Sequence, residues 1–155
     1  MKAVIAIDSF KGSMDSIEAG RAAAAGIKRV FPDAENVIYP LADGGEGTVQ
    51  ALAKGLGGKL EHVKVTGPLG EKVVCEYAIV GKTNPTAIIE MAGAAGITLV
   101  PPELRNPMNT TTYGVGEVIE DALTKNCRNF IIGIGGSATN DGGIGMLQAL
   151  GAELL

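Results

Sequence analysis

Residues 36–48 read NVIYPLADGGEGT, an apolar run that leads directly into a glycine-rich acidic loop. The run predicts a strand, and residues 48–56 after it predict a helix. The start of the chain has the same order, because the apolar residues 2–7 precede a loop and a helix that begins at a capping box of Asp15 and Glu18. The continuous apolar run at 2–7 indicates a strand covered on both faces. Two strand–loop–helix units in succession predict the beginning of a parallel sheet.

Further along the chain, the pattern changes to strands joined by short turns. Residues 59–66 and 71–80 are joined by the turn sequence GPLG, which predicts a hairpin and therefore an antiparallel insert or a second subdomain. The remaining predicted elements are strands at 86–91 and 128–134 and helices at 113–125 and 144–150. The expected fold class is α/β, with a parallel Rossmann-like three-layer sheet and a second α/β domain.

The composition limits the function classes that the chain can serve. Its 155 residues are enough for about one domain, and 46% of them are hydrophobic but only 4% aromatic, which predicts an aliphatic core. The net charge of −4 offers no basic face for nucleic acid, and the single histidine, His62, excludes a histidine metal cluster. No apolar stretch approaches a membrane span of about 18 residues. Cys75 and Cys127 form no paired motif, so we expect reduced thiols in a cytoplasmic protein.

The most informative stretch is the loop IGGSATNDGGIG at residues 134–145. Its glycines let backbone N–H groups approach phosphate oxygens, because glycine has no Cβ. We expect phosphate or nucleotide contacts from Gly135, Gly136, Ser137, Thr139, Gly142 and Gly143. Asp141 is a candidate Mg²⁺ ligand, and its alternative role is to cap the helix that follows. The loop is neither a Walker A motif nor a GxGxxG fingerprint in register, which counts against the alternative of a nicotinamide dinucleotide-binding protein.

The loop DGGEG at residues 43–47 places two carboxylates beside a predicted helix start. Ligands of open parallel sheets bind beyond the carboxyl ends of the strands, so this loop, the loop at 8–12 and the loop at 134–145 should converge on one site. Asp43 can accept the proton of a substrate hydroxyl. Glu46 can contact the substrate, or it only complements the dipole of the helix.

The loop at the end of the first predicted strand combines an acid, a hydroxyl and a cation. Asp8 can act as the catalytic acid or base, Ser9 can contact the substrate, and Lys11 suits a phosphate or carboxylate. Their alternatives are a turn-forming Asp8 and a solvated Lys11. Later in the chain, Arg105 can bind a carboxylate with two parallel hydrogen bonds, and Thr111 is a further candidate for substrate contact. A surface position is the alternative for Arg105.

Four motifs in this order resemble those of the bacterial type of glycerate kinase. They are DSFKGS at 8–13, ADGGEGT at 42–48, RNPMNTTTYGVGE at 105–117 and IGGSATNDGGIG at 134–145. The resemblance covers essentially the whole chain. It implies phosphorylation of D-glycerate by ATP with Mg²⁺, and 2-phosphoglycerate is the product that it leads us to expect. It also implies two α/β domains with the active site in the cleft between them.

The resemblance carries an expectation about domain organisation as well. One domain of the family is made from both ends of the chain, so residues 1–67 are expected to be the N-terminal part of a discontinuous α/β domain. Residues 68–155 would then start the second α/β domain. Because family members are more than twice as long, residues beyond 155 would complete both domains, and the fold is expected to be incomplete as given. The apolar Leu154 and Leu155 favour association, which allows a homo-oligomer.

The resulting hypothesis is that the chain takes part in phosphoryl transfer. This chemistry depends mainly on the positioning of the reactants and on charge neutralisation. Asp8, Lys11 and Asp43 are the candidate catalytic residues, with Asp8 or Asp43 as the proton acceptor. The partner that we expect is the small substrate D-glycerate, without nucleic acid or membrane. The alternative function is that of an incomplete fragment, which binds nucleotide or a small hydroxy acid without turnover.

Overall fold

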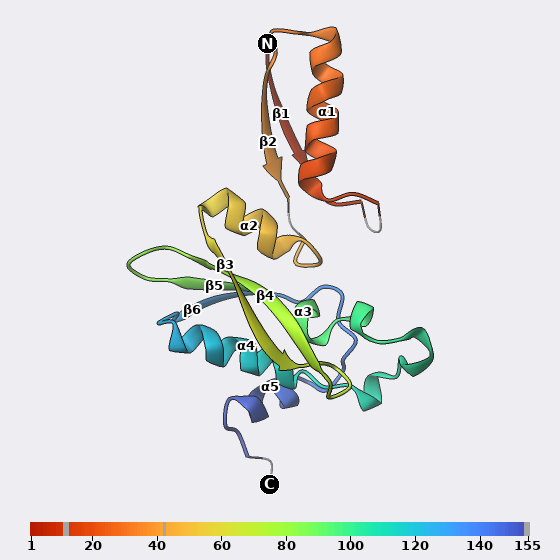
Figure 1. Cartoon of the computed structure of the whole chain (residues 1–155), viewed down its shortest axis with the longest axis vertical. Coiled ribbons are helices and arrows are strands. Elements are labelled where there is room, and N and C mark those ends of the chain that lie inside the picture. Colours follow the sequence, from red (N-terminus) through yellow and green to blue (C-terminus); the bar gives the residue numbers. More distant parts are fainter. Residues whose placement is uncertain (11–12, 42, 154–155) are drawn as a thin grey trace.

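The computed structural model describes residues 1–10, 13–41 and 43–153 and has the α/β class that the sequence predicts (Figure 1). A two-stranded sheet and a four-stranded sheet form in the described chain. The smaller sheet and its helix stand at one end of the molecule, and the larger sheet with the other helices forms the body (Figure 1). Lys11, Leu154 and Leu155, to which the sequence assigns roles, lie outside the described residues.

The N-terminal unit is a strand–helix–strand crossover, as predicted. β1 (Lys2–Ile7) and β2 (Glu35–Pro40) pair in parallel, and α1 (Ser16–Val30) connects them and packs against both strands. Val4 and Tyr39 remain 61% and 57% exposed. The prediction that the first strand is covered on both faces is therefore wrong for this structure, because α1 covers only one face of the narrow sheet.

α1 begins where its own sequence supplies both halves of the predicted capping box. Asp15 Oδ1 accepts the N–H groups of Ile17 and Glu18 at 2.8 and 2.7 Å, and Glu18 Oε2 accepts the N–H of Asp15 at 3.2 Å. These bonds satisfy N–H groups that have no partner inside the helix. The box fixes the start of α1 and thereby the end of the loop that carries Asp8.

The larger sheet contains β3 (Lys59–Thr66), β4 (Lys72–Val80), β5 (Thr86–Glu90) and β6 (Asn129–Gly133), in that order. The first three strands are antiparallel, and β5 and β6 are parallel. The hairpin that the GPLG sequence predicts joins β3 to β4. Its turn includes Gly70 with a φ of 94°, a conformation that a side chain would strain.

Helices cover both faces of the larger sheet. α2 (Thr48–Leu56) packs on β4 and β5, whereas α3 (Ala92–Ala95) and α4 (Tyr113–Thr124) pack on the opposite face, with α5 (Ile144–Ala149) against α4. The larger apolar cluster contains Val65, Cys75, Tyr77, Ala87, Ile89, Val115, Val118 and Ala122. Between α3 and α4 the chain forms 3₁₀ turns at Ile97–Leu99, Pro102–Leu104 and Pro107–Asn109. A three-layer arrangement is thus present, but around a mixed sheet and not around the parallel pair.

The division between the two sheets falls before β3, whereas the domain boundary expected after residue 67 stays a prediction. β3 pairs with β4 along its whole length, from Lys59 opposite Ile79 to Thr66 opposite Lys72. Because α2 also packs on β4 and β5, both α2 and β3 belong with the larger sheet. The change of sheet occurs between β2 and α2, within the acidic glycine-rich segment.

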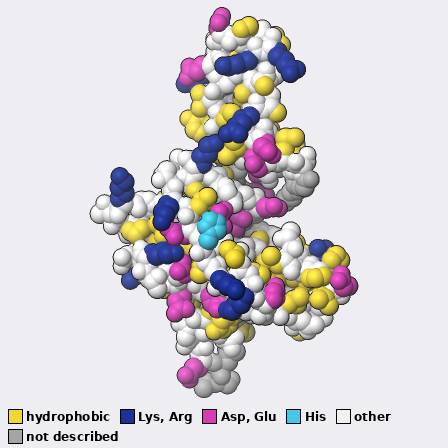
Figure 2. All heavy atoms as spheres, viewed as in Figure 1, with side chains coloured by type: hydrophobic (Ala, Val, Ile, Leu, Met, Phe, Trp, Pro, Cys, Tyr) yellow, Lys and Arg dark blue, Asp and Glu magenta, His cyan; other side chains and the backbone are white. Residues whose placement is uncertain are grey.

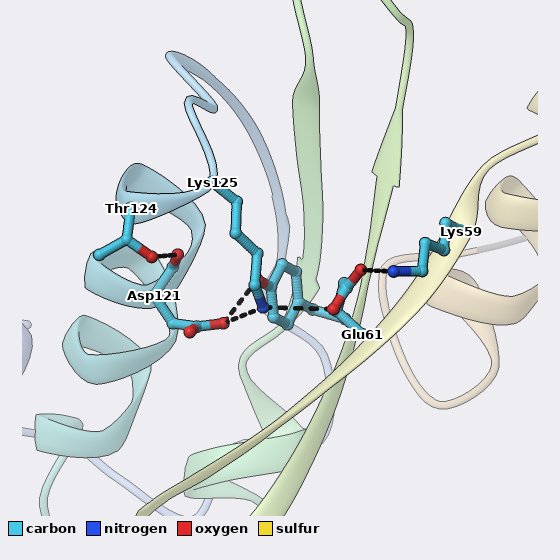
Figure 3. Close-up of polar contacts among 6 residues, drawn as sticks. Lys59, Glu61, Asp121, Thr124 and Lys125 are labelled. Carbon is cyan, nitrogen blue, oxygen red and sulfur yellow. Dashed lines mark hydrogen bonds and ion pairs between the residues drawn. The ribbon is translucent and has the colours of Figure 1, made fainter.

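A cluster of charged groups joins α4 to β3 and β4 (Figure 3). Lys125 Nζ lies 2.6 Å from Asp121 Oδ2 and 3.3 Å from Glu61 Oε2, and Lys59 pairs with Glu61 at 2.6 Å. The buried Tyr77 hydroxyl donates to Asp121 Oδ2 at 2.6 Å and accepts from Lys125 Nζ at 2.9 Å. Burial raises the pKa of Tyr77, and Asp121 raises it further, so the phenol remains a donor.

The two cysteines are buried in the body of the molecule, and the histidine pairs with a neighbouring strand of the larger sheet. Cys75 and Cys127 are free and buried, and burial raises the pKa of Cys75 to about 12, which excludes a reactive thiolate there at neutral pH. His62 Nε2 lies 2.9 Å from Glu76 Oε2 on the neighbouring strand. Among the helices that the structure describes, none has both the length and the apolar character needed to traverse a membrane.

Replacement of Gly114 by alanine tests the packing of α4 on β3. A Cβ at position 114 would overlap the carbonyl oxygen of Thr66, so Gly114→Ala should destabilise the protein by about 1–3 kcal/mol. Gly26→Ala in α1 is the control, because a Cβ there meets nothing within 4 Å. That change should stabilise by about 0.5–1 kcal/mol, since glycine has more freedom to lose on folding. Urea unfolding measures both, and equal midpoints would contradict the close packing of α4 on β3.

Candidate functional site

The glycine-rich loops that follow β2 and β6 meet through their backbones. The Gly135 N–H donates to Gly44 O at 2.9 Å, and we call this interaction the Gly44–Gly135 contact. A Cβ at Gly135 would lie 2.7 Å from Gly45 Cα, and a Cβ at Gly133 would lie 2.5 Å from Gly44 O. Only glycine permits this approach, because no side chain fits between the two backbones. The structure therefore brings together two of the three loops that the sequence predicts to converge.

An acidic cavity of about 510 Å³ lies where the N-terminal unit meets the body of the molecule. Five carboxylates line it, from Asp8, Asp15, Glu18, Glu46 and Glu90, and Ser9 and Gly47 also line it. Figure 2 shows acidic side chains gathered between the upper unit and the body. No lysine or arginine in the described part of the chain lines this cavity. Three predicted residues, Asp8, Ser9 and Glu46, thus share one strongly negative surface.

The two predicted proton acceptors have different positions. Asp8 lines the acidic cavity, and its Oδ1 accepts the N–H of Ser9 at 2.7 Å. Asp43 is exposed, its Oδ1 accepts the N–H of Gly45 at 2.8 Å, and it does not line the cavity. The structure therefore favours Asp8 over Asp43 as the group that can reach a ligand in this cavity.

Glu90 is a cavity residue that the sequence analysis missed. It ends β5, is 9% exposed, and its Oε1 accepts the N–H of Val49 at the start of α2 at 2.7 Å. Burial raises the pKa of Glu90 and outweighs the N–H groups of α2, which lower it. A glutamate at the end of the apolar run TAIIE was the available signal, but its partner lies 41 residues earlier in the chain.

A second pocket of about 280 Å³ is lined by Arg105, Ser137 and Thr139, three of the predicted ligand-binding residues. Arg105 Nε donates to Val100 O at 3.2 Å, and the Ser137 and Thr139 hydroxyl oxygens lie 2.9 Å apart. No carboxylate among the described residues lines this Arg105 pocket. Its positive charge suits an anion, whereas the acidic cavity suits a cation or a hydroxyl group.

Many N–H groups of the loop at 134–145 already have acceptors within the protein. Those of Gly135, Ala138, Thr139, Gly143 and Gly145 donate to protein oxygens at 2.9–3.2 Å. The predicted phosphate contacts through the N–H groups of Gly135 and Gly143 therefore conflict with the structure, because both donors are engaged. Gly136 and Gly142, with φ of 72° and 63°, donate no N–H bond within the described chain. These two remain candidates for phosphate contact.

Asp141 has the alternative role that the sequence allowed, that of a cap. Its Oδ2 accepts the N–H and the hydroxyl of Thr112, both at 2.8 Å, and the N–H of Gly145 at 3.2 Å, while Oδ1 accepts the N–H of Gly143 at 3.0 Å. Burial raises the pKa of Asp141, but these donors outweigh it and hold the pKa below its usual value. The carboxylate thus fills the anion position at the start of α5 that the sequence analysis assigned to phosphate.

The predicted site residues outside the loop glycines fall into three groups. Asp8, Ser9 and Glu46 line the acidic cavity; Arg105, Ser137 and Thr139 line the Arg105 pocket; Asp43, Thr111 and Asp141 line neither. Thr111 instead accepts the N–H of Tyr113 at 3.1 Å, at the start of α4.

Residues 3–155 match the model of the Glycerate kinase family. The glycerate kinase of Haemophilus influenzae is 58% identical over 155 residues, which are 100% of this chain and 41% of that protein. The glycerate 2-kinase of Escherichia coli is 54% identical over 154 residues, which are 99% of this chain and 40% of that protein. A crystal structure from Salmonella typhimurium LT2, of a protein that carries the name glycerate kinase 2, matches with a TM-score of 0.84 at 51% identity. The match covers 97% of this chain and 41% of the chain in that crystal structure. The chain spans about two fifths of the length of these relatives.

Asp141→Asn tests the capping role. The substitution removes the negative charge to which four groups donate, so we expect the free energy of unfolding to fall by about 1.5–3 kcal/mol. Asp43→Asn, at an exposed position, is the control and should change it little. Because the folded pKa is lowered, the contribution of Asp141 is present above the unfolded pKa near 3.8 and is lost as the pH falls through the folded value. Urea unfolding between pH 7 and pH 3 measures both effects. Unchanged stability of the Asp141→Asn chain, together with an altered Mg²⁺ requirement, would restore the metal-ligand hypothesis.

Proposed function

Because the chain belongs to the glycerate kinase family, we propose that it takes part in phosphoryl transfer from ATP to D-glycerate. The observation that supports this best is the Gly44–Gly135 contact. It joins the loop that leads into the acidic cavity to the loop that leads into the Arg105 pocket. Phosphoryl transfer depends on positioning and charge neutralisation, and two surfaces of opposite charge on adjoining loops provide both.

In this proposal, the acidic cavity receives the hydroxyl group that attacks the phosphoryl group. Asp8 accepts its proton, because Asp8 lines the cavity and Asp43 does not. Ser9 and Glu46 contact the substrate from the same wall. Lys11, outside the described residues, remains the candidate that neutralises phosphate or the glycerate carboxylate.

The donor chemistry of the acidic cavity fits Mg²⁺, a hard cation that carboxylate oxygens bind. In phosphoryl-transfer sites Mg²⁺ is usually held by one or two carboxylates, with phosphate and water as further ligands. Glu46 would hold it, because Glu46 lines the cavity and makes no side-chain hydrogen bond within the described chain. Asp141 suits this role less, since its two oxygens already accept four hydrogen bonds. When bound, Mg²⁺ supplies positive charge beside the transferred phosphoryl group.

The Arg105 pocket receives an anionic group of a substrate. A guanidinium group binds carboxylates and phosphates with parallel N–H bonds, and Ser137 and Thr139 add hydroxyl donors. We assign the glycerate carboxylate to Arg105 and phosphate oxygens to the two hydroxyls. The 2-hydroxyl of glycerate is the proposed acceptor, in keeping with the name glycerate 2-kinase of the Escherichia coli relative.

The alternative is that these 155 residues bind nucleotide or a small hydroxy acid without turnover. The observation that favours it is the share of the relatives' length that the chain spans, 40–41%. Binding of MgATP without ADP release would support this alternative.

Release of ADP from the purified chain with D-glycerate and MgATP tests the proposal, with a chain of the relatives' full length in parallel. We expect Asp8→Asn to lower kcat by roughly 100-fold or more, because general base catalysis contributes that much. Asp33→Asn, an exposed aspartate outside both cavities, is the control and should leave kcat unchanged.

Three outcomes separate the candidates. Turnover only in the longer chain makes these 155 residues an incomplete binding part. Turnover in neither chain contradicts glycerate as the substrate. Full turnover in Asp8→Asn removes Asp8 as the proton acceptor and returns Asp43 to consideration.

A further inference from the structure

Glu90 is the one charged side chain among the buried residues of the described chain. It is the last residue of β5, and the N–H of Met91 after it donates to Gly133 O at 2.9 Å, where the loop of the Gly44–Gly135 contact begins. Burial of a carboxylate costs several kcal/mol unless hydrogen-bond donors surround it. Specific donors must therefore hold Glu90 in place.

These donors are the N–H groups at the start of α2. The N-cap residue Gly47 has a φ of 91° and no side chain, so the helix has no local cap. Glu90 Oε1 accepts the N–H of Val49 at 2.7 Å, and the neighbouring N–H groups of Thr48 and Gly47 lower the pKa of this carboxylate. A carboxylate there satisfies N–H groups without helical partners and interacts favourably with the helix dipole.

The helix start that Glu90 holds is also the end of the acidic glycine-rich loop. Thr48 Oγ1 accepts the N–H of Gly44 at 3.2 Å, and the Thr48 N–H donates to Gly45 O at 3.2 Å. Glu46 lies between these bonded residues and lines the acidic cavity together with Glu90. The backbone that carries Glu46 is thus fixed through α2 to the end of β5.

We propose that Glu90 is a positioning residue, whose carboxylate fixes the start of α2 so that Glu46 faces the acidic cavity and Gly44 stays bonded to Gly135. Its effect on turnover rests on the proposed function, whereas its effect on the backbone at 47–49 does not. A carboxylate serves better than an amide, because its negative charge strengthens the bond to the Val49 N–H and interacts favourably with the dipole of α2.

Two variants and a matched control test the structural half. Glu90→Ala removes the acceptor and Glu90→Gln keeps the shape without the charge. Glu117→Gln removes another carboxylate that accepts a backbone N–H, that of Thr66, outside both cavities. We expect amide hydrogen exchange at 47–49, measured by NMR, to accelerate by roughly 10- to 100-fold in Glu90→Ala, less in Glu90→Gln, and not in Glu117→Gln. Unchanged exchange at 47–49 in the Glu90 variants overturns the proposal.

The functional half uses MgCl₂ as a probe together with kinetics. In the wild type, MgCl₂ should shift the amide signal of Glu46. Glu90→Ala should lose this shift and lower kcat by roughly 10-fold or more. A Glu90→Ala chain with faster amide exchange but with the kcat and the MgCl₂-induced shift of the wild type would lack only a helix cap, and this result would overturn the proposal. The proposal would also be overturned if MgCl₂ did not shift the Glu46 signal of the wild type.

If no chain turns over glycerate, the proposed function fails, and the MgCl₂-induced shifts still decide the role of Glu90. If Glu90→Ala does not fold, Glu90→Gln decides it by the same measurements.

Discussion

The Gly44–Gly135 contact is the constraint on which the candidate site depends. One loop runs from β2 of the N-terminal unit to α2, and the other runs from β6 of the larger sheet to α5. Their backbones approach so closely that a Cβ at Gly135 would lie 2.7 Å from Gly45 Cα. The contact therefore fixes the acidic loop against the loop that follows the larger sheet.

The two cavities differ in charge, and the proposed chemistry depends on this difference. Five carboxylates line one, and an arginine with three hydroxyl-bearing residues lines the other. Two acids near the site accept hydrogen bonds at the start of a helix: Asp141 at α5 and Glu90 at α2. These two carboxylates hold loop backbones in place, whereas Asp8 and Glu46 are the acids that we propose to contact ligands.

Local structure could be predicted from the sequence because its signals lie within a few residues of one another. The capping box of Asp15 and Glu18 and the GPLG hairpin are examples, and both form as expected. Partners distant in the chain could not be predicted: Asp141 and Thr112 are 29 residues apart, and Glu90 and Val49 are 41 apart. An aspartate beside glycines suits Mg²⁺ and a helix cap equally, so only the positions of the donors decide between them. The sheet to which β3 belongs could not be predicted for the same reason, since its neighbours in the sheet are set by long-range pairing.

Amide hydrogen exchange at Gly135, resolved by NMR, tests the central contact most directly. The account predicts that the Gly135 N–H, bonded to Gly44 O at 2.9 Å, exchanges as slowly as the N–H of Met91, which is bonded to Gly133 O at the same distance. Exchange of Gly135 at the rate of an unstructured peptide, with Met91 protected, would show that the two loops do not meet and would contradict the account.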